Sequence, residues 1–202
     1  MKKIVWIALM ILAIVPAGYA GSAGPRAESE HDPVMLVPIG DVDIGILTRL
    51  AKNAGPILDR GFIIGRRLPD PKYAYNASRG RYYSTVILKV MKREFEESGY
   101  KTVLGVIDRD ILAEGLNFVF GEADGMYAVI SVTRLREEFY GLPSNEELFE
   151  MRVLKEAVHE LGHTFGLEHC GDPRCVMYFS NTLGESDQKS WKFCEICERL
   201  SH

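Results

Sequence analysis

Apolar residues recur at helical spacing in two stretches of the first half of the chain. The first stretch runs from Ile44 to Ala54 and is predicted to end at Gly55-Pro56, because this pair disfavours a continuing helix. The second is predicted to begin at Ser84, as its cap, and to end at Gly99. Its apolar face carries Ile87, Leu88, Met91 and Phe95.

A third helix is predicted in the second half of the chain, after Pro143. Ser144 and Glu147 have the spacing of a capping box at its start. At about 100° per residue, His159 and His163 fall roughly opposite the apolar side. We therefore expect one face of this helix in the core and the other in a cleft. The apolar side carries Leu154, Ala157, Val158, Leu161 and Phe165.

Short runs of β-branched and other apolar residues predict the strands. These runs are Met35–Ile39, Phe62–Leu68, Thr102–Ile107, Asn117–Phe120 and Met126–Val132. The segment from Pro69 to Gly80 is rich in turn residues. The resulting order, β-α-β-α-β-β-β followed by the third helix, predicts a mixed α/β (α+β) fold with a twisted mixed sheet on one side.

Length and charge narrow the class of protein. The 202 residues suit one domain with a substantial core. The formal net charge is −4, and Lys and Arg are scattered along the chain. The sequence therefore lacks the clustered basic footprint of a nucleic-acid-binding protein, and we expect no nucleic-acid partner.

The first residues have the character of a targeting segment. Met1-Lys2-Lys3 is a short positive start, and an uninterrupted apolar run follows from Ile4 to Val15. Gly18 and Ala20 match the small-x-small rule for signal-peptidase cleavage. We therefore expect residues 1–20 to be a secretory signal peptide, cut before Gly21.

This interpretation makes the mature protein extracytoplasmic. Residues 21–33 are expected to form a disordered linker, and residues 34–202 the folded domain. Two alternatives stay open. The apolar run could remain as an uncleaved N-terminal anchor, which would be the only contact with a membrane, or translation could start at Met35 and give a cytoplasmic protein.

Candidate chemistry is concentrated between His159 and His169. Residues four apart on a helix stand one turn above each other, so His159 and His163 can hold a single metal ion. Glu160 projects at a neighbouring angle, which suits a zinc-bound water rather than the metal. As a general base it would take the proton of that water and pass it to the leaving amine.

The end of the motif supports a catalytic site. Gly166 can adopt the left-handed conformation that ends a helix, so that the chain can turn back. His169 can then approach the ion from another side. Three neutral imidazoles leave a fourth position open for water, which is typical of catalytic rather than structural zinc.

Four cysteines follow the histidine motif, as a C-x4-C pair and a C-x2-C pair. This spacing is typical of a four-thiolate zinc site. Two disulfides are the competing interpretation for an exported protein, and pairing across the two motifs is sterically possible. Met177 lies shortly after the second cysteine and could form a floor beneath the histidines. The cysteines are Cys170, Cys175, Cys194 and Cys197.

The pattern H-E-x-x-H-x-x-G-x-x-H followed by a methionine resembles the metzincin zinc peptidases. The cysteine directly after the last histidine, the C-x4-C-x-Met run and the later C-x2-C are similar to the archaemetzincins in particular. Val37-Pro38-Ile39-Gly40-Asp41 also resembles the start of those domains, so the resemblance covers residues 34–202.

This resemblance implies a compact metzincin-like catalytic domain with a backing helix, an active-site helix and a zinc-bound C-terminal segment. His159, His163 and His169 would bind catalytic zinc, Glu160 would be the base, and Met177 would be the Met-turn residue. It also implies a second, structural zinc, which would be bound by Cys170, Cys175, Cys194 and Cys197. An export signal departs from the family, whose members generally resemble cytosolic proteins.

The function predicted is hydrolysis of peptide bonds in a peptide or protein substrate, with two zinc ions per chain. Two other functions fit the same residues. The domain could be a non-catalytic zinc-binding interaction module, or a metal hydrolase that acts on a non-peptide amide. Glu160 and the open metal position argue against the first of these.

Overall fold

The computed structural model describes residues 31–201, in which a mixed five-stranded sheet forms the centre. The strand order is β2-β1-β5-β8-β7; the first four are mutually parallel, and β7 runs antiparallel to β8 at one edge. The bounds are β1 His31–Ile39, β2 Arg60–Ile64, β5 Thr102–Ile107, β7 Gly121–Asp124 and β8 Tyr127–Ser131.

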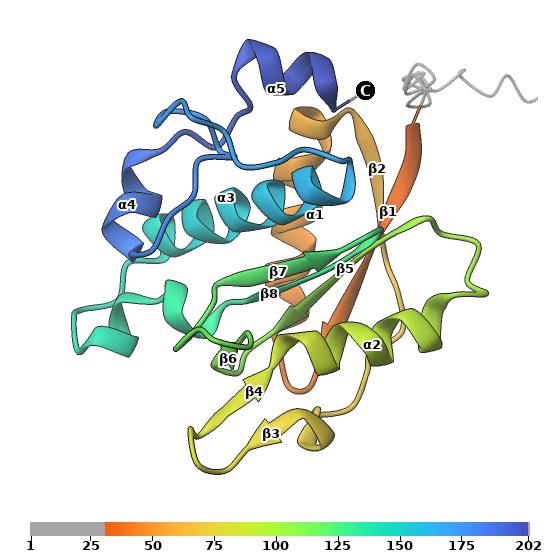
Figure 1. Cartoon of the computed structure of the whole chain (residues 1–202), viewed down its shortest axis with the longest axis vertical. Helices are drawn as coiled ribbons and strands as arrows, with labels where there is room; N and C mark the ends of the chain where they lie inside the picture. The colour runs from red at the N-terminus through yellow and green to blue at the C-terminus, as the bar shows by residue number, and fades with distance from the viewer. Residues whose placement is uncertain (1–30, 202) are drawn as a thin grey trace, which may run out of the picture.

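A small three-stranded sheet lies beside the central one (Figure 1). It consists of β3 Tyr75–Asn76, β4 Arg81–Tyr83 and β6 Ile111–Leu112. The 3-10 helices are η1 Lys72–Ala74, η2 Thr133–Leu135 and η3 Glu137–Tyr140. Asp110 joins these parts, because its carboxylate accepts hydrogen bonds from Arg134 of η2 and Arg81 of β4.

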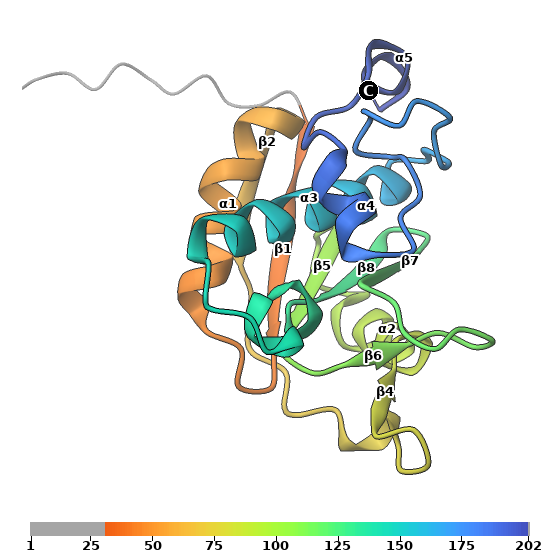
Figure 2. The same ribbon diagram turned by 90° about the vertical axis from the view of Figure 1, so that its left-hand side faces the viewer.

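Helices cover both faces of the central sheet (Figures 1 and 2). α1 (Ile44–Leu58) and α3 (Glu146–Thr164) pack on one face, and α2 (Ser84–Phe95) packs on the other. The short helices α4 (Leu183–Gln188) and α5 (Glu195–Leu200) belong to the C-terminal segment. The mixed α/β class is confirmed, but the expectation of a sheet on one side is wrong.

The alternation of side chains along the buried strands explains the three layers. Val34 and Leu36 of β1 join the core shared with α1 and α3, whereas Met35 and Val37 join the core shared with α2. Since consecutive residues of a strand point to opposite faces of the sheet, a continuous apolar strand is buried only when helices pack on both faces.

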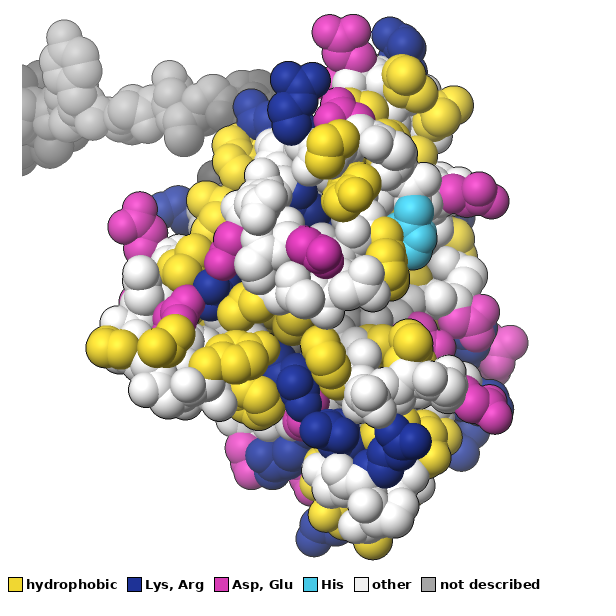
Figure 3. All heavy atoms as spheres, turned by 60° about the vertical axis from the view of Figure 1, so that its left-hand side comes forward, with side chains coloured by type: hydrophobic (Ala, Val, Ile, Leu, Met, Phe, Trp, Pro, Cys, Tyr) yellow, Lys and Arg dark blue, Asp and Glu magenta, His cyan; other side chains and the backbone are white. Residues whose placement is uncertain are grey.

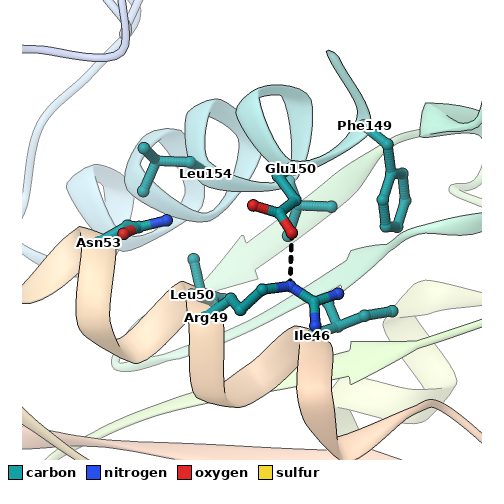
Figure 4. A pocket seen from close by; sticks show the side chains of 8 residues that line it. Ile46, Arg49, Leu50, Asn53, Phe149, Glu150 and Leu154 are labelled. Carbon is teal, nitrogen blue, oxygen red and sulfur yellow. Dashed lines mark ion pairs between the residues drawn. The ribbon is translucent and has the colours of Figure 1, made fainter. Parts of the chain in front are cut away.

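α1 and α3 pack against each other through apolar side chains, and an ion pair also joins the two helices. Figure 4 shows Arg49 of α1 pointing toward Glu150 of α3, and the two atoms Nε and Oε1 lie 2.6 Å apart. Leu50 and Phe149 help to line the hollow between the two helices. The hollow between them has a volume of about 10 Å³, room for one water molecule, so it offers no ligand site.

Four predicted helix ends are wrong. α2 ends at Phe95 rather than at Gly99. α1 continues through Pro56 to Leu58, because Gly55 has no Cβ to clash with the proline ring and Leu58 is buried in the core. α3 begins with Asn145 as its N-cap, whose side chain accepts a hydrogen bond from the backbone N–H of Leu148; Ser144 and Glu147 form no capping box.

Ser84 does not cap α2. The N-cap is Tyr83, and the Ser84 hydroxyl donates to Leu112 O and to the carboxylate of Glu122. Thr85 donates to the same carboxylate at 3.0 Å. Glu122 of β7 therefore lies at the positive end of α2, which favours a negative charge there.

Strand positions also differ from the prediction. The predicted strand Phe62–Leu68 corresponds to β2, which begins earlier, at Arg60, and ends at Ile64. Further along the chain, Leu68 forms a single β-bridge with Ile39. The predicted strand Asn117–Phe120 is a loop with one bridge at Val119, and the strand is β7 after it. β1 begins at His31, so the last residues of the predicted linker are part of the sheet. Among the described residues, no helix is long and apolar enough to cross a membrane.

Candidate metal centre and active-site cleft

Two histidines on α3 point their Nε2 atoms toward each other. His159 Nδ1 lies 2.8 Å from Val176 O, and His163 Nδ1 lies 2.8 Å from Leu167 O. These carbonyls require Nδ1 to carry the proton, so each Nε2 keeps its lone pair for a metal. The two Nε2 atoms are 3.2 Å apart.

His169 completes the group after the chain has turned back from the helix. Gly166 has φ +88°, in the left-handed region, as predicted for the residue that ends α3. The ligand nitrogens of the three histidines all lie within 4.8 Å of one another. Tetrahedral zinc with bonds of about 2.05 Å places its nitrogens about 3.3 Å apart, so this donor set fits zinc.

Burial keeps the central ligand neutral. It lowers the pKa of His159 to about 3, with a further contribution from the nearby ammonium group of Lys189. Burial also lowers the pKa of His169. Since only the unprotonated imidazole binds a metal, both rings are in the binding form at neutral pH.

Glu160 lies beside the histidines and is 5% exposed. Burial raises the pKa of its carboxyl well above the usual range, and the neighbouring carboxylate of Glu156 raises it further. β7 passes directly over this side chain: a Cβ atom at Gly121 would lie 2.5 Å from Glu160 Cγ. Glycine at this position lets the edge strand approach the carboxylate.

A cleft of about 570 Å³ contains these groups. Its floor includes the α3 residues His159, Glu160 and His163, and one wall is formed by β7 and the loop before it. The other wall comes from the C-terminal segment. That wall includes His169, Phe179, Ser180, Asn181 and Lys189. His169 is exposed, and Figure 3 shows a histidine side chain at the surface beside apolar side chains.

α3 is buried on almost all sides, so the prediction of one buried face and one open face is only partly confirmed. Arg152 and Lys155, both polar, are 3% and 5% exposed. Arg152 pairs with Asp187, and Lys155 donates to Ser186 O and Asp187 O. The C-terminal segment therefore covers the part of α3 that precedes the histidines.

The four cysteines form a second candidate metal site. Their Sγ atoms all lie within 4.8 Å of one another, and none is in a disulfide. Cys170 Sγ and Cys194 Sγ are 3.8 Å apart. This distance far exceeds a disulfide bond and equals the separation of about 3.8 Å expected for thiolates bound tetrahedrally to zinc at about 2.3 Å.

Met177 connects the two candidate metal sites. Its side chain is fully buried, and its Sδ packs against Gly162, between the two α3 histidines. Its carbonyl accepts a hydrogen bond of 2.9 Å from the N–H of Cys170, the residue after His169. The neighbouring Val176 carbonyl holds His159. Met177 thus lies where a floor beneath the histidines was predicted.

Two residues that line the cleft were missed from the sequence. Glu156 stands four residues before Glu160 on the same side of α3, and this helical offset could have indicated it. Lys189 comes from a distant segment without any motif, so no sequence signal placed it there. Glu156 is 6% exposed and Lys189 is 3% exposed.

The family model described as Peptidase family M54 matches residues 57–201. The archaemetzincin of Methanocaldococcus jannaschii is 46% identical over 166 residues, which cover 81% of this chain and 89% of that protein. Both the matched length and the identity show the family.

Solved structures agree with this result. The archaemetzincin of Archaeoglobus fulgidus, crystallised with malonate, has a TM-score of 0.72 and 37% identity over 83% of this chain and 99% of its own. A zinc-dependent peptidase from Methanocorpusculum labreanum has a TM-score of 0.74 and 26% identity, covering 84% and 100%. The chain belongs to peptidase family M54, the archaemetzincins, and is a zinc metallopeptidase.

Proposed function

We propose that this chain hydrolyses peptide bonds in the cleft at His159, His163 and His169, with Glu160 as the general base. The observation that carries the proposal is the convergence of three imidazoles beside a buried carboxylate in one cleft. Zinc held by these nitrogens would act as a Lewis acid and lower the pKa of a water molecule.

The residues of the chain would then move the proton. Glu160 accepts it from the attacking water and delivers it to the nitrogen of the leaving amine. Burial and the neighbouring Glu156 raise the pKa of its carboxyl, which makes the carboxylate a stronger base for the first of these steps. The carbonyls of Val176 and Leu167 keep the two α3 imidazoles in the orientation that binds metal.

The substrate is proposed to be a polypeptide in extended conformation. β7 is the edge strand of the central sheet and forms a wall of the cleft. An edge strand offers backbone donors and acceptors to an added strand, so a peptide beside β7 would lie across Glu160.

We further propose that Cys170, Cys175, Cys194 and Cys197 bind a second zinc ion with a structural role. Their tetrahedral spacing supports it, and so does the hydrogen bond from Cys170 to Met177. An ion held there would fix the segment that carries His169, because Cys170 follows it directly.

Glu160→Ala tests the mechanism. We expect turnover to fall about 10³-fold while the zinc content stays unchanged, since the base is not a ligand. Elemental analysis should give two zinc ions per chain in both proteins. Glu168→Ala, at an exposed position of the same motif, is the control and should keep full activity. Full activity in Glu160→Ala would contradict the mechanism, and one zinc ion per chain would contradict the second site.

We also propose that the protein is exported and cut between Ala20 and Gly21. This proposal depends on the sequence of residues 1–20 alone, which lie outside the described residues. Mass spectrometry of the native protein should give an N-terminus at Gly21. An intact Met1 in a soluble cytoplasmic fraction would exclude export.

A further inference from the structure

Lys189 places a buried ammonium group in the cleft without a direct ion pair. Its side chain is 3% exposed and lines the cleft. Among residues 31–201, no carboxylate oxygen lies within 4.0 Å of its ammonium nitrogen. Glu156 and Glu160 act on it only from a greater distance. A carboxylate in direct contact with Nζ would therefore have to come from a ligand.

The hydrogen bonds of Lys189 are incomplete as well. An ammonium group has three N–H donors. One donor reaches Tyr178 O at 3.2 Å. His159 Nδ1 is 3.4 Å away, but it carries the proton that it donates to Val176 O and cannot accept another. The remaining donors have room for an acceptor in the cleft.

Ser180 offers a second donor on the same wall. Its Oγ atom is buried and has no hydrogen-bond partner among the described residues. Ser180 lines the same cleft as Lys189. A buried hydroxyl without a partner is destabilising, so it too is suited to a ligand that brings an acceptor.

The formal charges of the cleft balance in the zinc-loaded enzyme. Glu122, Glu156 and Glu160 line the cleft, and Glu156 and Glu160 are the carboxylates that act most strongly on Lys189. The metal and Lys189 together offset these three carboxylates. Preference for an incoming carboxylate therefore depends on direct hydrogen bonds from Lys189 and Ser180 rather than on the net charge of the cleft.

We propose that Lys189 and Ser180 form a subsite that binds the carboxylate side chain of a substrate residue flanking the scissile bond. An Asp or Glu side chain would accept charge-assisted hydrogen bonds from Nζ and Oγ. Nζ lies 3.4 Å from His159 Nδ1, the nitrogen on the side of the ring away from the metal-binding Nε2, so the subsite lies beside this ligand. This inference rests on the proposed peptidase function of the same cleft.

Kinetics with matched peptides tests this subsite. The peptides have blocked, amidated ends and differ only in whether Glu or Gln stands beside the scissile bond. The position before the bond and the position after it are varied in turn. We expect kcat/KM to be about tenfold higher for Glu at one flank, as for a hydrogen bond to a charged group. Lys189→Met should abolish this preference, and Ser180→Ala should reduce it about threefold.

Lys155→Met is the matched control. Lys155 is also a buried lysine, but it donates to Ser186 O and Asp187 O and does not line the cleft. This variant loses a comparable buried charge and should keep the preference for Glu. A preference that survives in Lys189→Met, or that is lost equally in Lys155→Met, overturns the subsite.

A binding measurement separates this inference from the proposed function. Fluorescence anisotropy of the same labelled peptides on zinc-loaded Glu160→Ala protein needs no turnover. The Glu peptide should bind about tenfold more tightly, and the double variant Glu160→Ala/Lys189→Met should bind both alike. Selective binding by Glu160→Ala, together with no cleavage of either peptide by the unmodified enzyme, would support the subsite and contradict the proposed hydrolysis. If Glu160→Ala binds the Glu and Gln peptides equally, the proposed subsite is wrong. If a preference appears only in peptides with free C-termini, the group bound is the carboxylate of the chain end and not a side chain.

Discussion

At the scale of single residues, the position of the proposed base depends on how closely β7 approaches Glu160. Gly121 permits this approach because it has no side chain at the contact. The three histidines and Glu160 were predictable, since they share one helix and its turn and their offsets are visible in the sequence. Gly121 and Lys189 were not, because tertiary packing brings them to the site from distant segments.

Gly121→Ala should therefore impair catalysis without removing zinc. The added Cβ would lie 2.5 Å from Glu160 Cγ, so the carboxylate or the strand must shift. Because displacement by about 1 Å can cost up to 100-fold in rate, we expect kcat/KM to fall at least about tenfold. Steady-state kinetics with zinc analysis measures both quantities.

Gly184→Ala is the control for this substitution. A Cβ at Gly184 meets nothing within 4 Å, so activity should be unchanged. If Gly121→Ala retains the activity of the unmodified protein, the edge strand does not constrain the base.

At the scale of elements, the middles of the helices were predicted and their ends were not. Apolar periodicity identified the bodies of α1, α2 and α3 because burial of a face determines it. The ends depend on local competition between neighbouring polar groups: Asn145 rather than Ser144 begins α3. The loop before β7 is as apolar as a strand, which explains why it was assigned as one.

Asn145→Ala should destabilise the protein by about 1 kcal/mol, the usual cost of losing an N-cap. The hydrogen bond from Leu148 N to Asn145 Oδ1, of 3.1 Å, is the interaction removed. Urea unfolding gives the free energy of unfolding. Ser144→Ala should change the free energy of unfolding by much less. A larger loss in Ser144→Ala than in Asn145→Ala would show that Ser144 is the N-cap.

At the scale of the whole molecule, the fold class and the family were predictable from the sequence, but the layering was not. The apolar run Val34–Val37 is buried on both faces of the sheet, whereas a sheet on one side was predicted. Assigning α1 and α2 to opposite faces of the sheet requires the handedness of the connections, which no single segment encodes.

Asp110 should make the stability of the whole domain depend on pH. Burial raises the pKa of its carboxyl, but hydrogen bonds from Arg134 and Arg81 outweigh this and lower it below the ordinary value. Because the folded pKa lies below the unfolded one, this stabilisation is complete above the unfolded value of about 3.9 and is lost as the pH falls through the folded pKa.

Asp110→Asn should therefore lower the free energy of unfolding by about 2 kcal/mol at pH 7 and by little at pH 2. Denaturant unfolding across this pH range measures the difference. Asp124→Asn, which removes an exposed ion pair with Lys92, should have almost no effect at either pH. If the free energy of unfolding depends on pH in the same way for Asp110→Asn and for the unmodified protein, Asp110 is not the source of this pH dependence.

The loop before β7 has a consequence for how this protein can diversify. It forms a wall of the cleft, and Leu116 within it is 50% exposed. The β-bridge from Val119 to Ile111 and the hydrogen bond from Arg79 to Asn117 Oδ1 attach the loop to the small sheet. Substitutions or insertions around Leu116 would reshape the cleft while the three histidines and both cores stay intact. Selection can thus change the substrate specificity of the enzyme through this loop without changing the residues of the metal centre.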